Sequence, residues 1–277
     1  MRIVVLCSSI YSETACAVAV RLCEMGYIPA VLSLPTFNRN TLLRKLGQWG
    51  IRTVAQYART KLVRGKHHKY FQPRNRYLQP WLKHETGVFI NLRDVSNCYG
   101  FPISVVANQN SPDAVSRLEA WSPDLIVFTG GNILREPILT LPRLGVLNIH
   151  LGLLPQIRGM SSPEWSLLNG VPVGVTIHSM DPGIDTGPIL QKYEYAYLAH
   201  CESLADLRHR LIAFGVDKLG DVVAALDRGT IIGTPQPALN ASYRSDNQYF
   251  VMHEWLRQRA AAFLTKRNQP FAETVHG

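Results

Sequence analysis

The sequence predicts an α/β protein with a doubly wound, mostly parallel, Rossmann-like sheet and a small C-terminal extension. Short β-branched apolar runs alternate with stretches long enough for helices, the pattern of a sheet covered on both faces. This alternation begins at Ile3–Leu6 and changes to purely helical periodicity after about Cys201. A chain of 277 residues, 46% hydrophobic and 18% charged, accommodates one such domain and an appendage. We therefore expect a main domain over residues 1–200 and an extension over residues 201–277.

The composition of each segment and the turn residues beside it predict the strands and helices one by one. Ile3–Leu6 has the composition of a buried parallel strand, and the next helix begins at Glu13 and is stopped by Gly26. Tyr27–Leu34 is expected to be the second strand. Further strands are expected at Phe101–Ala107, Leu125–Phe128, Val146–His150 and Val175–His178, and helices at Ser111–Trp121, Ser161–Asn169, Leu204–Leu226 and His253–Lys266.

The cysteines form no pattern typical of disulfides or metal sites. There are five, an odd number, spread from Cys7 to Cys201 without a C-x-x-C pair. The apolar run at the N-terminus is only about five residues long, and charged residues follow it, so it is too short to span a bilayer. We therefore expect a cytoplasmic protein that holds no metal.

Polar residues gather at the end of one expected strand and in a later loop. Asn148 and His150 alternate with apolar neighbours, so both side chains lie on one face of the strand. The carboxyl ends of strands are where open α/β sheets bind ligands. Asp185 follows in the loop MDPGIDTG, where proline and glycine favour tight turns.

An amide, an imidazole and a carboxylate together suit acyl transfer to an amine. The imidazole of His150 can move a proton near neutral pH, and the Asn148 amide can stabilise a developing oxyanion. The carboxylate of Asp185 can hold the histidine and favour its charged form. The spacing alone leaves an alternative open. In it His150 is an ordinary core or turn residue, and the aspartate only stabilises a turn.

The motif N-x-H-x-x-x-L-P-x-x-R-G, followed by G-V-T-x-H-x-M-D-x-G-I-D-T-G-P-I-L, resembles the core signature of the folate-dependent formyltransferases. The resemblance implies that Asn148, His150 and Asp185 are catalytic, and that Asp181 is not. It also implies that 10-formyltetrahydrofolate is the formyl donor. The amine would attack the formyl carbon directly, without an enzyme nucleophile.

The same resemblance implies residues for binding the folate, and other loops of the sequence offer residues for the acceptor. The pterin is expected against the backbone of two loops, through Asn132, Ile133 and Leu134 in one and through Met180 and Ile184 in the other. The acceptor is expected near three residues of two further loops, namely Ser8, Ser9 and Arg158. Hydroxyls and amides at a helix start suit a phosphate, although helix capping by Ser12 accounts equally well for this turn.

The acceptor implied by the resemblance is a small molecule, and a nucleotide-linked amino sugar is favoured. Methionyl-tRNA formyltransferases carry a C-terminal RNA-binding barrel, whereas the region after Cys201 begins with a long helix and shows no run of alternating strands. Transfer RNA is therefore a less favoured acceptor. Two other functions stay open, a formyltetrahydrofolate hydrolase and a nucleic-acid-binding protein on this fold.

One segment carries the basic character of the chain, whose net charge is +9. Between Met25 and His84 there is no acid but there are twelve Lys or Arg, and within it an insertion is expected over about residues 38–85. Four of its cations recur every seven residues, at Lys45, Arg52, Arg59 and Lys66. Three interpretations are open: a solvated surface insertion, a site for an anionic acceptor or tRNA, and contact with an acidic membrane surface.

Overall fold

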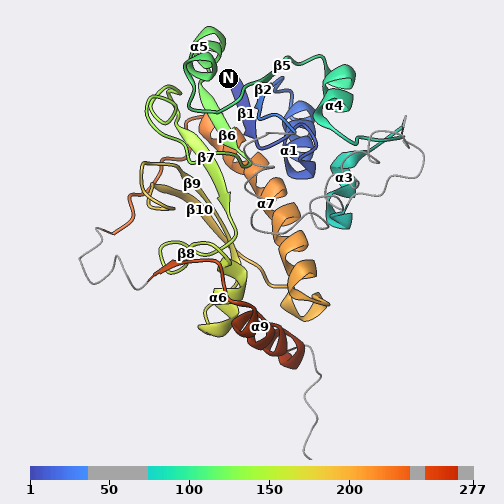
Figure 1. Cartoon of the computed structure of the whole chain (residues 1–277), viewed down its shortest axis with the longest axis vertical. Coiled ribbons are helices and arrows are strands. Elements are labelled where there is room, and N and C mark those ends of the chain that lie inside the picture. The colour runs from blue at the N-terminus through green and yellow to red at the C-terminus, as the bar shows by residue number, and fades with distance from the viewer. Residues whose placement is uncertain (37–73, 86, 238–246, 268–277) are drawn as a thin grey trace, which may run out of the picture. The chain divides into compact units, whose positions relative to one another are not determined.

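The computed structural model describes residues 1–36, 74–85, 87–237 and 247–267 (Figure 1). Most of the expected basic insertion, with Lys45, Arg52, Arg59 and Lys66, lies outside the described residues. The chain divides into two compact units, Met1–Val146 and Leu147–Gly277. The division into residues 1–200 and 201–277 stays a prediction.

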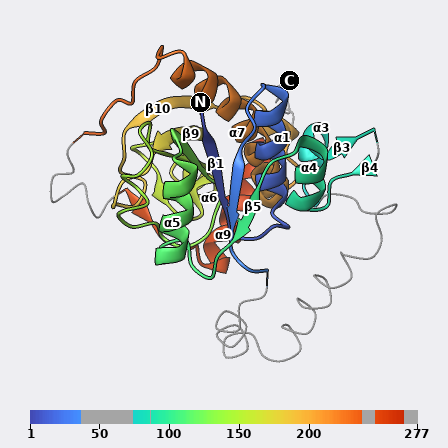
Figure 2. The ribbon, with the colours of Figure 1, turned by 90° about the horizontal axis from the view of Figure 1, so that it is seen from above.

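The first unit has four parallel strands flanked by helices, and a short antiparallel pair of β3 with β4. Its elements are β1 (Ile3–Cys7), α1 (Glu13–Glu24), β2 (Ala30–Ser33), the 3-10 helix η2 (Arg76–Leu78), α3 (Gln79–Leu82), β3 (Lys83–His84), β4 (Gly87–Val88), α4 (Leu92–Tyr99), β5 (Ile103–Val105), α5 (Pro112–Trp121) and β6 (Leu125–Phe128). The order β6-β1-β2-β5 is parallel throughout. Figure 2 shows α1 and α5 on opposite sides of β1. The doubly wound α/β class is therefore confirmed.

Local chemistry accounts for the bounds of these elements. All five residues of β1 are buried, and Ser12 caps α1 by accepting a hydrogen bond from the Ala15 N–H. The second strand is shorter than expected and begins at Ala30, because Gly26 has a positive φ and Pro29 has no N–H for a ladder. Helix α4 was not predicted, although Asn91 and Asp94 form a capping box at its start.

The second unit has three antiparallel strands, a short parallel pair of β8 with β11, and two longer helices. Its elements are the part of β7 (Val146–His150) from Leu147 onward, β8 (Arg158–Gly159), α6 (Ser162–Leu168), β9 (Gly174–Ser179), β10 (Ile189–Glu194), the 3-10 helix η3 (Leu198–His200), α7 (Leu204–Asp227), β11 (Gln248–Tyr249) and α9 (Glu254–Arg267). Strand β9 pairs antiparallel with both β7 and β10. The β7–β9 register sets Asn148 opposite His178. Strand β10 was not predicted.

Helix α7 packs along β9 and helix α9 packs on α6, as Figure 1 shows. A buried cluster fills the space between these elements, with Val175 of β9, Leu207 and Leu211 of α7, and Leu264 of α9 among its members. The fully buried carboxylate of Glu164 accepts two hydrogen bonds from the Arg208 guanidinium at 2.6 and 2.7 Å, which ties α6 to α7. Among the described residues, no helix has the length and apolar character needed to cross a bilayer.

Gly215 brings the middle of α7 directly against β7. A Cβ at this position would overlap the Cγ2 atom of Ile149, a branch that cannot swing away from its backbone. Ile149 lies between Asn148 and His150, so this contact supports the strand that carries both polar side chains. The close packing explains a glycine inside a helix, where alanine is normally preferred.

We predict that Gly215→Ala lowers the free energy of unfolding by about 1–3 kcal/mol, because overpacking outweighs the gain in helix propensity. Chemical denaturation measures this change. In an Ile149→Ala background the overlapping branch is gone, and the same substitution should be neutral or stabilising. A stabilising Gly215→Ala in the otherwise unchanged chain would contradict the packing described here.

Candidate active site

Four polar side chains of the second unit converge near the ends of β7 and β9. Asn148 and His150 come from β7, His178 from β9, and Asp185 from the loop before β10. The side chain of His150 is 6% exposed and that of His178 is 2% exposed, so both imidazoles are almost withdrawn from water. The three residues that the sequence nominated as catalytic therefore lie together in one unit, joined by a second histidine.

His150 lies between a carbonyl oxygen and a carboxylate. Its Nε2 atom is 2.8 Å from the Ile157 carbonyl oxygen, and its Nδ1 atom is 3.3 Å from Asp185 Oδ2. A carbonyl oxygen only accepts hydrogen bonds, so Nε2 carries a proton and donates it. The other nitrogen, Nδ1, is therefore the one that gains or loses a proton, and it faces the carboxylate.

Burial lowers the pKa of His150 below its ordinary 6.5, although Asp185 and the Ile157 carbonyl act in the opposite direction. The neighbouring His178 lowers the pKa of His150 further. Asp185 does favour the charged form of this histidine, but desolvation of a fully buried ring outweighs one adjacent carboxylate. At neutral pH the resting imidazole is neutral, and Nδ1 can accept a proton.

Asp185 is held firmly and is ionised. Its Oδ2 atom accepts a hydrogen bond from the Gly159 N–H at 2.8 Å. Burial alone would raise the pKa of Asp185, but the adjacent rings of His178 and His150 and the Gly159 N–H outweigh burial and lower it to about 2. Its backbone has φ +53°, a left-handed conformation that costs roughly 1 kcal/mol for a residue with a side chain.

Asp181 forms hydrogen bonds within its own loop and does not contact the histidines in the way Asp185 does. Its Oδ1 atom accepts hydrogen bonds from the Gly183 N–H at 3.1 Å and the Thr186 hydroxyl at 2.5 Å. These bonds close a turn of the loop upon itself, which is an ordinary role of an aspartate that precedes proline and glycine. The geometry thus separates a turn-forming aspartate from Asp185, which faces both histidines.

His178 is a site residue that sequence reasoning did not nominate. Its Nδ1 atom donates to the Ser179 carbonyl oxygen at 2.9 Å, and its Nε2 atom lies 3.2 Å from Asn148 Nδ2 and 3.5 Å from Asp185 Oδ1. Because the nitrogen of an amide only donates, Nε2 accepts one N–H of Asn148 and fixes the orientation of that amide. The signal was present as an alternating polar residue in the strand G-V-T-I-H, but only the β7–β9 register places it beside Asn148.

Arg158 lies on β8 and is 2% exposed. Its guanidinium donates to the side-chain oxygen of Gln236 at 2.8 and 3.3 Å. The sequence nominated Arg158 as an acceptor-binding residue, and the structure gives it this intramolecular partner. Gln236 was not foreseen, because nothing in the Pro/Gln-rich stretch around it predicts a distant contact.

The predicted folate- and acceptor-binding residues divide between the units. Met180 and Ile184 flank the turn closed by Asp181, and Ile184 is 52% exposed. Arg158 also belongs to the second unit, and the remaining residues lie in the first unit. There Ile133 is 81% exposed and Leu134 is buried, so Leu134 offers a ligand its backbone only. Binding by the members of this set stays a prediction: Ser8, Ser9, Asn132, Ile133, Leu134, Arg158, Met180 and Ile184.

In the first unit, the loop after β6 is tied to a neighbouring loop. The Asn132 N–H donates to the side-chain oxygen of Gln109 at 2.8 Å, and the Gln109 N–H donates back to Asn132 Oδ1 at 3.2 Å. Ser9 accepts a hydrogen bond from the Tyr11 N–H at 3.2 Å and caps its own turn, while Ser8 is exposed. Ser8 and the Ile133 side chain are the exposed parts of these loops, whereas the Ile133 carbonyl oxygen accepts a hydrogen bond from the Asn110 amide at 2.9 Å.

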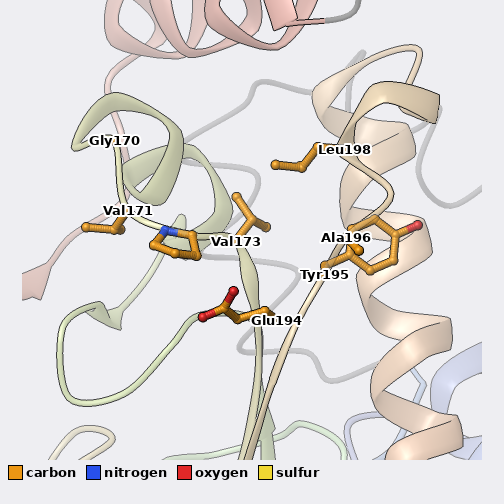
Figure 3. A pocket seen from close by; sticks show the side chains of 8 residues that line it. Gly170, Val171, Val173, Glu194, Tyr195, Ala196 and Leu198 are labelled. Carbon is orange, nitrogen blue, oxygen red and sulfur yellow. The ribbon is translucent and has the colours of Figure 1, made fainter.

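A pocket of about 270 Å³ opens where β9 begins and β10 ends. Figure 3 shows Val173, Glu194 and Leu198 among the side chains around it. None of the four converging residues lines this pocket, so it is separate from the candidate active site.

Among the residues that the structure describes, no cluster of three or more His, Cys, Asp or Glu could hold a metal ion.

Comparison with known proteins identifies relatives for a large part of the chain. Residues 93–223 match the family model described as "Formyl transferase". Methionyl-tRNA formyltransferase of Trichlorobacter lovleyi is 32% identical over 154 residues, which are 55% of this chain and 48% of that protein. The chain thus spans about half the length of this curated relative.

Solved structures share the fold at low sequence identity. A sugar N-formyltransferase from a Shewanella species matches with a TM-score of 0.56 and 15% identity, over 95% of this chain and 87% of that one. WlaRD, a sugar 3N-formyl transferase solved with dTDP and 5-N-formyl-THF, matches with a TM-score of 0.52 and 12% identity, over 90% of this chain and 70% of that one. The predicted resemblance to the formyltransferases is confirmed.

We predict that Asp185 contributes stability that is lost in acid. Its pKa in the folded chain, about 2, lies below the ordinary 3.8, so the contribution is complete above pH 4 and disappears as the pH falls through 2. Between neutral pH and pH 2, the free energy of unfolding should fall for both proteins. The fall should be about 2 kcal/mol larger for the natural chain than for Asp185→Asn. Asp221→Asn, at an exposed site of the same unit, serves as the control. Equal acid sensitivity of the natural chain and Asp185→Asn would show that this carboxylate is not held as described.

Proposed function

Residues 93–223 belong to the formyl transferase family, and from that premise we propose that this chain transfers a formyl group from 10-formyltetrahydrofolate to a primary amine. The observation that carries the proposal is the neutral, buried His150, whose Nδ1 atom lies 3.3 Å from the ionised Asp185. A neutral ring accepts a proton, and the adjacent carboxylate stabilises the imidazolium that results. The pair is therefore suited to a reaction in which an attacking amine sheds a proton.

The first step is attack of the amine on the formyl carbon. A carbon–nitrogen bond forms, the formyl oxygen becomes an oxyanion, and the amine nitrogen becomes positively charged. His150 takes a proton from this nitrogen at Nδ1 while Nε2 keeps its hydrogen bond to the Ile157 carbonyl. Because Asp185 stays ionised, the new positive charge forms beside a negative one and not in an apolar site.

Asn148 is placed to stabilise the oxyanion. A side-chain amide has two N–H groups, and His178 Nε2 accepts one of them. The amide orientation is thereby fixed, and the second N–H is available for the formyl oxygen without any reorganisation. In the second step the bond from carbon to N10 of the folate breaks, and the imidazolium returns its proton to that nitrogen. Tetrahydrofolate and the formamide are the products.

The proposed acceptor is a nucleotide-linked amino sugar. Among the described residues after Cys201, the helices and strands are the long helix α7, the two-residue strand β11 and helix α9. These elements do not alternate as the strands of an RNA-binding barrel do. The comparison with WlaRD, whose structure holds dTDP, supports the same choice of acceptor class. Transfer RNA is the second candidate, because the curated relatives at 32% identity are methionyl-tRNA formyltransferases.

We predict that His150→Asn and Asp185→Asn each lower kcat for formyl transfer by at least about 100-fold, the usual range for loss of a general acid–base group. The fold should persist, as monitored by circular dichroism and thermal unfolding. His200→Asn and Asp221→Asn are matched controls, because both residues are exposed and lie in the same unit. Turnover near that of the natural chain in either site variant would overturn these roles.

A panel of amines identifies the acceptor. The protein is incubated with 10-formyltetrahydrofolate and UDP-, dTDP- or GDP-linked amino sugars, methionyl-tRNA or glycinamide ribonucleotide, and tetrahydrofolate release is followed. We expect release that depends on a nucleotide-linked amino sugar. Release that is equal with and without every amine would identify a hydrolase, and no release in any mixture would refute the proposed function.

A further inference from the structure

Gln236 contacts the loop that carries Asp185 from a distant part of the sequence. Its side-chain N–H groups donate to the carbonyl oxygens of Asp185 at 2.9 Å and of Gly187 at 2.8 Å. Its side-chain oxygen accepts the two hydrogen bonds from the Arg158 guanidinium at 2.8 and 3.3 Å. Both donors of this amide and its acceptor are thus used within one small network.

The orientation of the Gln236 amide is dictated by its partners. A guanidinium has donors only, so the oxygen of the amide must face Arg158 and the NH₂ group must face the loop. Arg158 is almost fully buried and cannot turn outward to water at low cost. The network therefore has one arrangement, which directs both N–H groups to the carbonyl oxygens of the loop.

The backbone before Gln236 is also fixed. Thr234 pairs with Ile189 at the start of β10 through two hydrogen bonds of 2.7 and 2.8 Å. Gly233 lies so close to Pro188 that a Cβ there would be 2.9 Å from the proline Cβ. The pairing of Thr234 with Ile189 brings the chain after α7 back to the end of the loop that carries Asp185. Gln236 follows two residues later.

The loop needs an external restraint at this point. Asp185 has its left-handed backbone, and Gly187 lies against the carbonyl of Ser179 with no room for a side chain. The two hydrogen bonds from Gln236 hold the carbonyls on either side of Thr186. Gly159, the residue after Arg158, holds the Asp185 carboxylate itself. Both parts of Asp185 are therefore held from strand β8. Gly159 holds the side chain directly, and Arg158 holds the backbone through Gln236.

We propose that Gln236 and Arg158 are positioning residues that keep the Asp185 carboxylate against Nδ1 of His150. Neither residue needs to touch the reacting atoms, because the network acts on the backbone of the loop. The catalytic consequence rests on the proposed formyl transfer, whereas the positioning itself does not.

The test compares two substitutions of Gln236 with one control. Gln236→Met keeps the length of the side chain and removes every hydrogen bond, whereas Gln236→Glu keeps an acceptor for Arg158 and loses both donors to the loop. We expect each to lower kcat by about 100-fold with little change in KM, the cost of a displaced catalytic group. Gln191→Met, at an exposed site on β10, should leave kcat unchanged. A normal kcat in Gln236→Glu would overturn the proposal.

A double-mutant cycle separates positioning from general support of the fold. In an Asp185→Asn background, Gln236→Met should cause little further loss of kcat, because the group that it positions is already gone. A full additional loss in that background would identify a merely structural role and refute the proposal.

A titration of His150 by NMR gives a readout that does not need activity. Loss of the nearby carboxylate should lower the pKa of His150 further, in Asp185→Asn and equally in Gln236→Met. An unchanged His150 titration in Gln236→Met would overturn the proposal even if the protein proves inactive toward every acceptor. Absence of formyl transfer in the natural chain would refute the proposed function alone.

The natural chain provides a check that does not depend on how the variants fold. Both side-chain N–H protons of Gln236 should exchange slowly with water, because each is held by a carbonyl. Rapid exchange of both protons would show that the network does not form and would likewise overturn the proposal.

Discussion

The contact between the buried imidazole of His150 and the carboxylate of Asp185 is the constraint on which the site depends. Removing a histidine from water favours its neutral form, while a carboxylate beside it favours the charged form. Here burial prevails, yet Asp185 remains ionised with a pKa of about 2. The site therefore holds one fixed negative charge next to a ring that is neutral at rest. Proton uptake by that ring is then stabilised where it occurs.

Much of the surrounding structure serves to keep this contact in place. The Ile157 carbonyl fixes which nitrogen of His150 carries the resting proton. Gly159 and Gln236 hold the side chain and the backbone of Asp185, in a conformation that a residue with a side chain seldom adopts. On the far side of the strand, Gly215 allows α7 to approach Ile149 closely. The first three contacts act on His150 or Asp185 directly, and the fourth supports the strand that carries His150.

The sequence predicted the elements best where local chemistry alone decides them. Leu125–Phe128 and Val146–His150 were predicted with the observed bounds, because the first is a short apolar run and the second alternates polar with apolar residues. Strand β10, with its exposed Gln191 and Lys192, offers no apolar run and forms through pairing with β9. The site shows the same contrast. Asn148 and His150 followed from strand periodicity, whereas His178 depends on register and Gln236 on a contact across 51 positions of sequence.

The central claim is that His150 accepts a proton while Asp185 stabilises the charge that results. The pH dependence of single-turnover formyl transfer tests it most directly, with the natural chain and Asp185→Asn compared. The rate should rise with pH through a midpoint below 6.5, because burial lowers the pKa of His150. In Asp185→Asn the rate should be lower at every pH and its midpoint should move to a lower pH, since the attraction that opposes burial is lost. A midpoint that is unchanged or higher in Asp185→Asn would contradict the account.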